Sequence, residues 1–503
     1  MNFEGYPTDP GYTFGYYPFL SPSFLRLITL NKSASLPSRQ PLRYLELGYG
    51  NGVSLNIHAA ASPGDYWGTD VNPSHVAFAN ELAQISGSGA HVLSLSFADL
   101  LNYSELPDFD VIVAHGVWSW VSEENRRTIL ELVRSKLVDG GIFYVSYNAL
   151  PGAAPTIPLQ RLLRLPSEPG NFQGTSMDRL EAGISLAQAL RDAGSKFFAN
   201  TPLAAEQLEV IKCKNPTYLC HEYLGEDWTA FSFAETARKL SDMGLNFVGS
   251  ANLLDHYEEL VFDVKGLKFL ASINDGWIRE TVGDFLRNRQ FRRDVYVKGD
   301  VKAAPAEWDE LLQDAAFVRI LPEEETPAVA ETPAGHVELN KPPFSNVLAA
   351  LAEDEYRCKT VRELGQQCDN GRQEALRGLF ILAQLGLIQP VQDRSLIERA
   401  AQSCQKLNEW VLNESRTGHK LRALASPVTG CGIPLSRERQ LFFLALKRGA
   451  NSPAQWADFA WEILEKETSS DCLGRSGALQ GATLLREALA FQKSAATLVG
   501  LGL

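Results

Sequence analysis

The sequence predicts an α/β domain with a mostly parallel, doubly wound sheet near its N-terminus, followed by mainly helical regions. Short apolar stretches alternate with stretches of helical spacing from residue 42 to residue 147. Repeated strand–helix units of this kind form parallel sheets with right-handed crossovers. A glycine-rich turn follows the first predicted strand, where such folds bind ligands. The 503 residues exceed one ordinary core, so two to four domains are expected.

The turn after the first predicted strand carries glycines at alternate positions, Gly48, Gly50 and Gly52. Glycines let a ligand approach the backbone closely, and free N–H groups at the start of the next helix attract an anionic group. The dinucleotide-binding pattern needs a glycine where this sequence has Val53. Glu46, just before the turn, would repel phosphates and attract a cation. The turn therefore suits a ligand with an ammonium group, a carboxylate and an adenosine better than NAD.

Five strands are predicted, at residues 42–47, 66–70, 92–97, 110–114 and 142–147. Pro73 opens the helix after the second strand, and Ser122 opens an acidic-first helix that Gly140 and Gly141 end. Ligands in such sheets bind beyond the carboxyl ends of the strands. The side chains expected at those ends are Glu46, Asp70, Asp99, His115 and Asn148.

Asp70 follows Gly50 by 20 residues. This is the spacing at which an acid at the end of the second strand accepts hydrogen bonds from ribose hydroxyls. An aspartate at a strand end often only caps a helix, but Asn72 competes for that role here. The glycines upstream favour the ribose interpretation for Asp70. Asp99 either meets an adenine edge or caps a turn.

Together these stretches resemble the class I S-adenosylmethionine-dependent methyltransferases, which have a Rossmann-like fold. The resemblance is carried by residues 44–52, 68–70 and 109–112. Residues 114–122 (AHGVWSWVS) and 144–152 (YVSYNALPG) narrow it to bacterial methyltransferases with a methyltransferase regulatory domain. That group includes the rickettsial outer-membrane-protein lysine methyltransferases. Tyr49 departs from the pattern, since many relatives have Cys or a small residue there.

The resemblance implies S-adenosyl-L-methionine as the cofactor and no metal. Glu46, Gly48 and Gly50 would contact its methionine part, Asp70 its ribose, and Asp99 with Leu100 its adenine. His115 would lie near the sulfonium; a structural His115, hydrogen-bonded to backbone, is the alternative. The complete set expected to bind the cofactor is Glu46, Gly48, Gly50, Asp70, Val71, Asp99, Leu100 and His115.

The expected reaction is methyl transfer to a nucleophile, with the lysine amine of a protein substrate as the first choice. A lysine amine, with an ordinary pKa of about 10.4, must lose a proton before it attacks. An aromatic channel would lower that pKa by desolvation and would stabilise methylammonium products. The candidates for the channel are Tyr16, Tyr17, Trp118, Trp120 and Tyr147. Trp118 and Trp120 point apart on a strand, so at least one of them belongs to the core. The residues predicted to be catalytic are His115, Tyr16, Trp118 and Tyr147.

Three alternatives compete with this interpretation. The methyl acceptor could be a small molecule. A closed pocket would favour a small molecule, whereas an open groove would favour a protein. The chain could be a cofactor-binding scaffold that works through its C-terminal module. An NAD-dependent oxidoreductase is disfavoured by Val53 and Glu46.

The domain organisation follows from composition and helical spacing. Residues 1–152 form the methyltransferase domain, whose aromatic N-terminal segment is either a lid over the ligand or a cap on a core. Residues 153–320 form a mainly helical middle domain, and the Pro- and Glu-rich residues 321–343 form a linker or exposed loop. Residues 344–395, with three helices and a short strand, suggest a winged-helix-like module. Residues 396–503 form a C-terminal helical region.

Two polar stretches of the middle domain are candidates for a functional role. His221-Glu222 lacks a second histidine four residues on, so a structural or substrate-facing His221 is favoured over a metal ligand. The arginine-rich residues 286–298 could bind an acidic partner, but a strip of salt bridges is favoured. The third helix of the winged-helix-like module offers only Arg372 and Arg377, so that module is expected to contact protein.

The amino-acid composition limits the kinds of binding partner and the cellular compartment that are expected. A net charge of -13 argues against broad binding to nucleic acid or to anionic membranes. The seven cysteines form no CxxC pair, which suggests reduced thiols rather than disulfides or a zinc site. The polar start is no signal peptide, and no apolar run is long enough to span a bilayer. A cytoplasmic protein without membrane insertion is expected, and a homodimer stays open.

Overall fold

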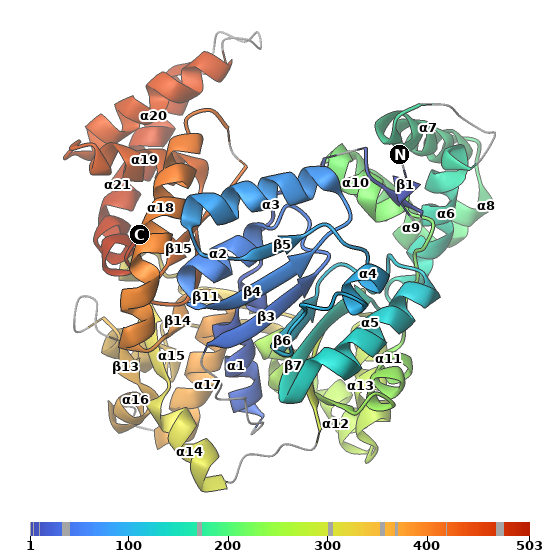
Figure 1. The fold of residues 1–503 in the computed structure, drawn as a ribbon, viewed down its shortest axis with the longest axis horizontal. Coiled ribbons are helices and arrows are strands. Elements are labelled where there is room, and N and C mark those ends of the chain that lie inside the picture. The colour runs from blue at the N-terminus through green and yellow to red at the C-terminus, as the bar shows by residue number, and fades with distance from the viewer. Residues whose placement is uncertain are drawn as a thin grey trace.

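The computed structural model describes residues 2–3, 5–9, 11–32, 41–168, 174–299, 305–352, 358–367, 371–418, 420–468 and 477–503. A seven-stranded sheet forms the centre of the molecule, with helices on both faces (Figure 1). In spatial order it consists of β5 (His91–Leu93), β4 (Gly64–Thr69), β3 (Leu42–Leu47), β6 (Phe109–Ala114), β7 (Leu137–Asn148), β9 (Phe291–Lys298) and β8 (Leu245–Ser250). The strands from β3 to β7 are parallel, whereas β9 runs antiparallel to both neighbours. The predicted Rossmann-like α/β class is confirmed.

Alternation along β3 directs side chains into two cores. Tyr44 joins the core that includes α1 (Pro22–Asn31), whereas Leu45 and Leu47 join the core on the other face. The helices that pack on that other face are α4 (Phe97–Leu101), α5 (Glu123–Lys136) and α11 (Phe233–Ser241). Glu46 lies on the Tyr44 side, where the Tyr44 hydroxyl donates to its Oε2 over 3.3 Å. The carboxylate at the end of β3 is therefore buried, with 4% of its surface exposed.

Two element boundaries in this domain differ from the sequence prediction. The third strand ends at Leu93 rather than near residue 97, and α4 begins directly after Ser96. The Ser96 hydroxyl accepts a hydrogen bond from the Asp99 N–H over 3.1 Å, so this serine caps α4. Asp99 thus lies in the first turn of a helix and not at a strand end. Gly140 and Gly141 do not end α5; both lie within β7, which begins right after that helix.

The predicted domain boundary at residue 152 does not coincide with an edge of the sheet. β8 and β9 come from the predicted middle domain, yet β9 pairs with β7 from Ile142↔Val297 to Asn148↔Phe291. The segment between β8 and β9 consists of η4 (Leu253–His256), η5 (Glu258–Leu260), α12 (Val264–Ala271) and α13 (Gly276–Leu286). The sheet is therefore completed by residues more than 90 positions beyond β7, a long-range pairing that local sequence patterns do not reveal.

A helical lobe with its own small core stands beside the sheet (Figure 1). Its helices are α6 (Ile157–Arg164), α7 (Ser176–Asp192), α8 (Lys196–Asn200), α9 (Pro202–Lys212) and α10 (Pro216–Tyr223). Leu159, Leu180 and Leu208 are fully or almost fully buried in that core. Residues 153–223 are thus mainly helical, as the sequence predicts.

The next module contains the three helices predicted there, with a small sheet of order β13-β10-β14. Its elements are α14 (Pro305–Asp314), β10 (Ala316–Arg319), α15 (Phe344–Ala350), β13 (Lys359–Thr360), α16 (Val361–Gln367), α17 (Gly371–Gln384) and β14 (Ile388–Val391). The winged-helix assignment stays a prediction. Within residues 321–343, β11 (Val329–Thr332) and β12 (Gly335–Glu338) form a largely exposed hairpin. Glu325 forms an ion pair with Arg439 at 2.7 Å, so this segment is attached to the C-terminal region.

The C-terminal region packs against the first helices of the sheet domain. It comprises α18 (Arg394–Glu414), β15 (Ala423–Ser426), β16 (Cys431–Pro434), α19 (Arg437–Lys447), α20 (Pro453–Thr468) and α21 (Gly477–Gly500). α18 lies on α2 (Val53–Ala61) and α3 (Pro73–Ser86), and the Ser403 hydroxyl donates to the carbonyl of Ala60 over 2.7 Å. The C-terminal region therefore shares a core with α2 and α3 of the sheet domain.

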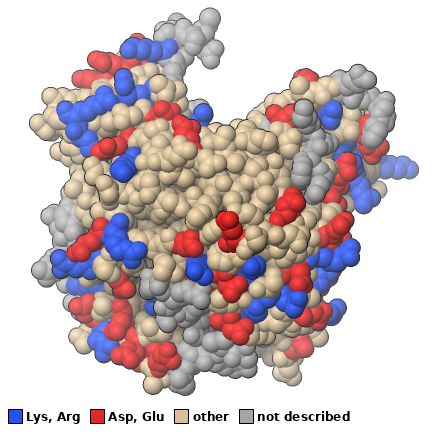
Figure 2. All heavy atoms as spheres, in the orientation of Figure 1, with Lys and Arg blue, Asp and Glu red and all other residues tan. Residues whose placement is uncertain are grey.

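Figure 2 shows a hollow in the surface between the helical lobe and the C-terminal helices, over the region of α3. Few charged side chains appear there, whereas acidic and basic side chains mix over the rest of this face. Cys213, Cys220, Cys358, Cys404 and Cys431 are free thiols. Cys368 and Cys472 lie outside the described residues. Of the helices in the described ranges, none combines the length and apolar character that crossing a bilayer requires.

Candidate active site

The turn after β3 has the backbone conformation that its glycines predict. Gly48 and Gly50 have φ angles of 69° and 60°, in the left-handed region that side chains rarely adopt. A Cβ on Gly50 would also lie only 2.9 Å from the ring of Tyr12. Glycine at position 50 is therefore required both by the backbone and by the close approach of the N-terminal segment.

Asp70, at the end of β4, is bound to this turn. Its Oδ2 accepts a hydrogen bond from the Gly50 N–H over 2.9 Å, and its Oδ1 accepts one from the Asn72 N–H over 2.9 Å. His75 Nδ1 lies 3.1 Å from the same Oδ1. These contacts fix the carboxylate at the mouth of a small cavity.

That cavity has a volume of about 110 Å³ and forms a largely apolar slot beside Asp70. Gly48, Gly50, Asp70, Val71, Ser96, Phe97, Val117 and Val121 line it. The apolar side chains of Phe97 and the valines suit a mostly apolar ring system, and the carboxylate of Asp70 offers an acceptor for hydroxyl groups. The slot therefore matches an adenosine.

A larger cavity of about 430 Å³ adjoins the slot. The residues that line both cavities are Tyr6, Tyr12, Gly48, Gly50, His115, Gly116 and Trp120, so the N-terminal segment, the glycine turn and the end of β6 form their common boundary. Many of the residues that line the larger cavity are aromatic. Its aromatic residues, apart from the histidines, are Tyr6, Tyr12, Tyr17, Phe19, Tyr49, Trp120, Tyr218, Tyr223, Trp228 and Phe291.

Glu46 faces this larger cavity from the end of β3. Removal from water raises the pKa of its carboxyl to about 8, although the hydrogen bond from Tyr44 acts in the opposite direction. A buried carboxyl with this pKa readily binds a cation, because a positive partner restores the ionised form.

His115 lies at the end of β6, where both cavities meet. Its Nδ1 is 3.0 Å from the Tyr144 hydroxyl and 3.0 Å from the Ser146 hydroxyl. Burial, with a smaller effect of the Arg293 charge, lowers the pKa of His115 to about 3. The imidazole is therefore neutral near pH 7, held by side-chain hydroxyls rather than by backbone.

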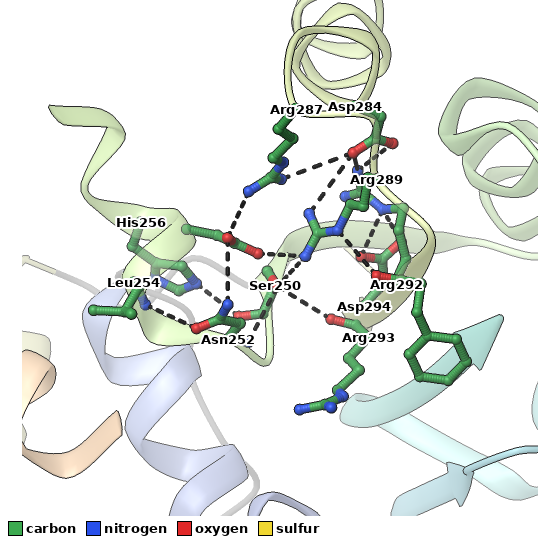
Figure 3. Close-up of polar contacts among 12 residues, drawn as sticks. Ser250, Asn252, Leu254, His256, Asp284, Arg287, Arg289, Arg292, Arg293 and Asp294 are labelled. Carbon is green, nitrogen blue, oxygen red and sulfur yellow. Dashed lines mark hydrogen bonds and ion pairs between the residues drawn. The ribbon is translucent and has the colours of Figure 1, made fainter. Parts of the chain in front are cut away.

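The arginines in and just before β9 differ in their partners: some form buried ion pairs, whereas Arg293 does not (Figure 3). Arg292 is fully buried and donates to Asp284 over 2.8 Å and to Asp294 over 2.9 Å. Arg287 forms a further ion pair with Asp255 at 2.7 Å. Salt bridges are thus present in this stretch, but they lie within the predicted middle domain and not between domains; their members are Arg287, Arg289, Arg292, Asp255, Asp284 and Asp294.

Arg293 points away from this network and into the larger cavity (Figure 3). Its guanidinium lies 4.5 Å from the centre of the Phe19 ring. No carboxylate among the described residues forms an ion pair with it. Arg293 and Glu46 both line this cavity, and both act electrostatically on Tyr17, in opposite directions. An α-amino acid, with one ammonium and one carboxylate, suits this pair of charges.

S-adenosylmethionine combines this amino-acid group with an adenosine, and the residues present therefore fit it. Of the cofactor residues predicted from the sequence, six line one or both cavities: Glu46, Gly48, Gly50, Asp70, Val71 and His115. Asp99 and Leu100 do not. Asp99 is exposed and accepts a hydrogen bond from the Ser96 hydroxyl over 2.7 Å, and Leu100 is buried under the sheet. Ser96 and Phe97 take the place in the slot that the sequence suggested for those two residues.

Three of the four residues predicted to be catalytic lie away from the cavities. Tyr16 packs between α2 and β16, where its hydroxyl accepts a hydrogen bond from the Gly432 N–H. Trp118 is fully buried in the core. Tyr147 is also fully buried, and its hydroxyl donates to Asp294 over 2.6 Å. Only His115 lines the site, together with the channel candidates Tyr17 and Trp120.

The N-terminal aromatic segment lies over the glycine turn. Asn51 Nδ2 donates to the carbonyl of Tyr12 over 2.9 Å, and His221 Nε2 lies 2.9 Å from the carbonyl of Gly11. His221 is thus structural, although its ring also borders the cavity. Within the described ranges, no group of three or more His, Cys, Asp or Glu side chains is arranged to hold a metal ion.

Sequence reasoning missed the contribution of Arg293, Glu222 and Tyr218 to the cavity wall. They come from β9 and α10, which lie far from the glycine turn in sequence. Two signals were visible in the sequence: the arginine-rich residues 286–298, which include Arg293, and the acidic, aromatic stretch 218–228.

The fold and the two cavities define a methyltransferase, and comparisons with known proteins agree. Residues 45–143 match the family described as "Methyltransferase domain", and residues 215–298 match the "Predicted methyltransferase regulatory domain". The chain belongs to the class I S-adenosylmethionine-dependent methyltransferases that carry this regulatory domain. Its family includes protein sll1526 of Synechocystis sp., which is 32% identical over 492 residues, covering 96% of this chain and 94% of the relative.

Other relatives come from Rickettsia. Protein RP028 of Rickettsia prowazekii is 30% identical over 236 residues, covering 46% of this chain and 90% of the relative. The structure of PKMT2 from Rickettsia typhi in complex with AdoHcy has a TM-score of 0.64 and 19% identity, covering 96% of this chain and 98% of that one. At this identity the likeness shows that the two chains share a fold along almost their whole length.

Proposed function

We propose that this methyltransferase transfers the methyl group of S-adenosylmethionine to the side-chain amine of lysine in a protein substrate. The cofactor supplies an electrophilic methyl group on a sulfonium. The chain's own residues hold the two reactants in line, and alignment of this kind can contribute roughly 7–11 kcal/mol to catalysis.

Each part of the cofactor has a partner in this proposal. Asp70 accepts hydrogen bonds from the ribose, and Phe97 with Val71 and Val117 encloses the adenine. Glu46 binds the ammonium of the methionine part, and Arg293 binds its carboxylate. The turn of Gly48 and Gly50 lets the backbone approach the nucleoside closely.

The observation that carries the proposal is the shared wall of the two cavities. His115, Gly116, Gly48 and Gly50 border both the slot and the larger cavity, so an acceptor in the larger cavity would face the methyl donor. The aromatic wall supports an amine as acceptor, because ring faces attract ammonium and methylammonium groups by cation–π contact. Resemblance to the rickettsial lysine methyltransferases supports a protein substrate.

The test is methyl transfer from radiolabelled S-adenosylmethionine to a bacterial protein extract, followed by acid hydrolysis and amino-acid analysis. We expect label in N-methyllysine, and much less label when Asp70→Asn replaces the wild-type protein at a cofactor concentration near the wild-type KM. Label confined to small molecules, or to another amino acid, would contradict the proposal.

A further inference from the structure

One carboxylate in the larger cavity has no role in holding the cofactor. Glu222 lies near the end of α10 and faces the same cavity as the glycine turn. Its Oε2 accepts a hydrogen bond from the Tyr218 hydroxyl over 3.1 Å. The side chain is half-buried.

Glu222 forms no ion pair among the described residues. Lys214 lines the same cavity and acts on the charge of Glu222, but its ammonium lies over the ring of Tyr218, 5.9 Å from its centre, and forms no ion pair with Glu222. Glu209 of the same lobe, by contrast, lies on the surface and binds both Arg191 and Lys212. An unpaired carboxylate inside a cavity therefore distinguishes this position.

The groups around Glu222 are mainly aromatic, with Lys214 as the one cation that acts on its charge. Those that face it or act on its charge are Tyr6 and Tyr12 from the N-terminal segment, Lys214, Tyr218, His221 and Tyr223 from α10 and the turn before it, and Trp228 from the loop after it. Partial removal from water raises the pKa of Glu222 to about 7, although the Tyr218 hydrogen bond lowers it. The carboxyl can therefore hold or release a proton near neutral pH.

A carboxylate surrounded by ring faces suits an alkylammonium ion, because charge pairing and cation–π attraction act on the same group. We propose that Glu222 binds the ammonium group of the incoming lysine side chain and accepts one of its protons. This inference rests on the proposed function. In the step, one N–H bond of the ammonium breaks and an O–H bond forms on Glu222, which leaves a neutral amine and a neutral carboxyl. The lone pair of the amine is then free to form the new N–C bond.

Glu222→Gln tests this role, because glutamine keeps the shape and can still accept from Tyr218 but carries no charge. The substrates are synthetic peptides that each contain one lysine. We expect KM for the peptide to rise about 10- to 100-fold, as the loss of a charged hydrogen bond predicts. Affinity for S-adenosylhomocysteine, measured by calorimetry, should stay within about twofold of wild type. Glu181→Gln, at an exposed position of α7 in the same lobe, is the matched control and should change neither value.

The pH profile separates a proton acceptor from a merely structural carboxylate. In the wild type, kcat/KM should fall below about pH 7, where Glu222 is protonated, and again above the pKa of the lysine. In Glu222→Gln the acid limb at pH 7 should vanish, and the rate should climb with pH as neutral amine appears in solution. Tyr218→Phe retains Glu222 but removes a hydrogen bond that lowers its pKa, so the acid limb should shift to higher pH.

The outcomes distinguish the two proposals. Wild-type protein that binds S-adenosylhomocysteine yet methylates no lysine peptide contradicts the proposed function and this inference with it. Wild-type methylation with unchanged KM and pH profile in Glu222→Gln overturns this inference alone. Should Glu222→Gln fail to bind S-adenosylhomocysteine, Tyr218→Phe decides, and an unshifted acid limb overturns the inference.

Discussion

The backbone N–H of Gly50 donates to Oδ2 of Asp70 over 2.9 Å, so the turn after β3 and the end of β4 form one unit. Twenty residues separate them in sequence, yet the aspartate is positioned by the glycine before any ligand arrives. This preorganisation reduces the cost of ordering the site when the ribose binds.

Asp70→Asn should weaken binding of S-adenosylhomocysteine about 10- to 100-fold, because a neutral amide replaces a charged acceptor. Isothermal titration calorimetry measures this directly. Asp108→Asn, at an exposed position just before β6, is the control and should bind like wild type. Equal affinity in wild type and Asp70→Asn would mean that the ribose lies elsewhere.

Arg293→Met should weaken binding of S-adenosylhomocysteine but leave binding of 5′-methylthioadenosine unchanged. The second ligand has the same nucleoside and lacks the amino-acid group that Arg293 is proposed to bind. Calorimetry with both ligands isolates the contact, since the smaller ligand serves as the internal control. A parallel loss of affinity for both ligands would indicate a damaged slot instead.

Arg292→Met should destabilise the fold much more than Arg293→Met does. Removal of the buried guanidinium takes away the arginine that pairs with both Asp284 and Asp294, which should lower the free energy of unfolding by about 3–5 kcal/mol. Arg293→Met should cost at most about 1 kcal/mol, the scale of an exposed cation–π contact with Phe19. Urea unfolding measures both variants; similar losses for both would contradict the division of roles on β9.

Glu46 should release a proton when the ligand binds. Its pKa of about 8 keeps the carboxyl mostly protonated at pH 7, and the ammonium of S-adenosylhomocysteine requires the ionised form. We expect about one proton released per bound ligand at pH 7, read from the dependence of the binding enthalpy on buffer ionisation. Glu46→Gln should show no such release.

The same shift predicts how stability without ligand depends on pH. Between the ordinary glutamate pKa and about 8, the folded protein holds a proton on Glu46 that the unfolded chain has lost. The contribution of Glu46 to the free energy of unfolding therefore decreases as the pH rises toward 8. Relative to wild type, Glu46→Gln should become more stable as pH increases from about 6 to about 8, and a constant difference would contradict the assignment.

Substitutions of Tyr16 and Tyr17 should have different effects, the first on stability and the second on activity. Tyr16→Phe removes the acceptor of the Gly432 N–H and should lower the melting temperature without loss of methyl transfer. Tyr17→Ala removes a cavity wall whose ring lies 4.5 Å from that of His115, and should reduce transfer at least about tenfold. Activity lost in Tyr16→Phe but kept in Tyr17→Ala would contradict the position of the site.

The sequence predicted the parts of the site that local patterns encode. Glycines at alternate positions after an apolar strand indicated the turn, and the spacing to Asp70 indicated the second strand end. Asp99 was placed less well, because strand and helix starts are hard to distinguish when a serine cap interrupts a short apolar stretch. Tyr16 and Tyr147 could not be assigned from sequence, since whether an aromatic ring faces a cavity or a core depends on distant segments such as Gly432 and Asp294.

The acceptor side of the site depends on contacts that no local pattern contains. Arg293 reaches the cavity only because β9 inserts antiparallel beside β7, and Glu222 reaches it only because the helical lobe folds back over the glycine turn. In both cases the residue type was visible in the sequence, but its neighbours were not.

A crystal structure with S-adenosylhomocysteine tests the central claim most directly. We predict that its ribose hydroxyls bind Asp70, that its amino-acid group lies between Glu46 and Arg293, and that its sulfur faces the aromatic cavity beside His115. A nucleoside bound outside the slot, or a sulfur turned away from that cavity, would contradict the account.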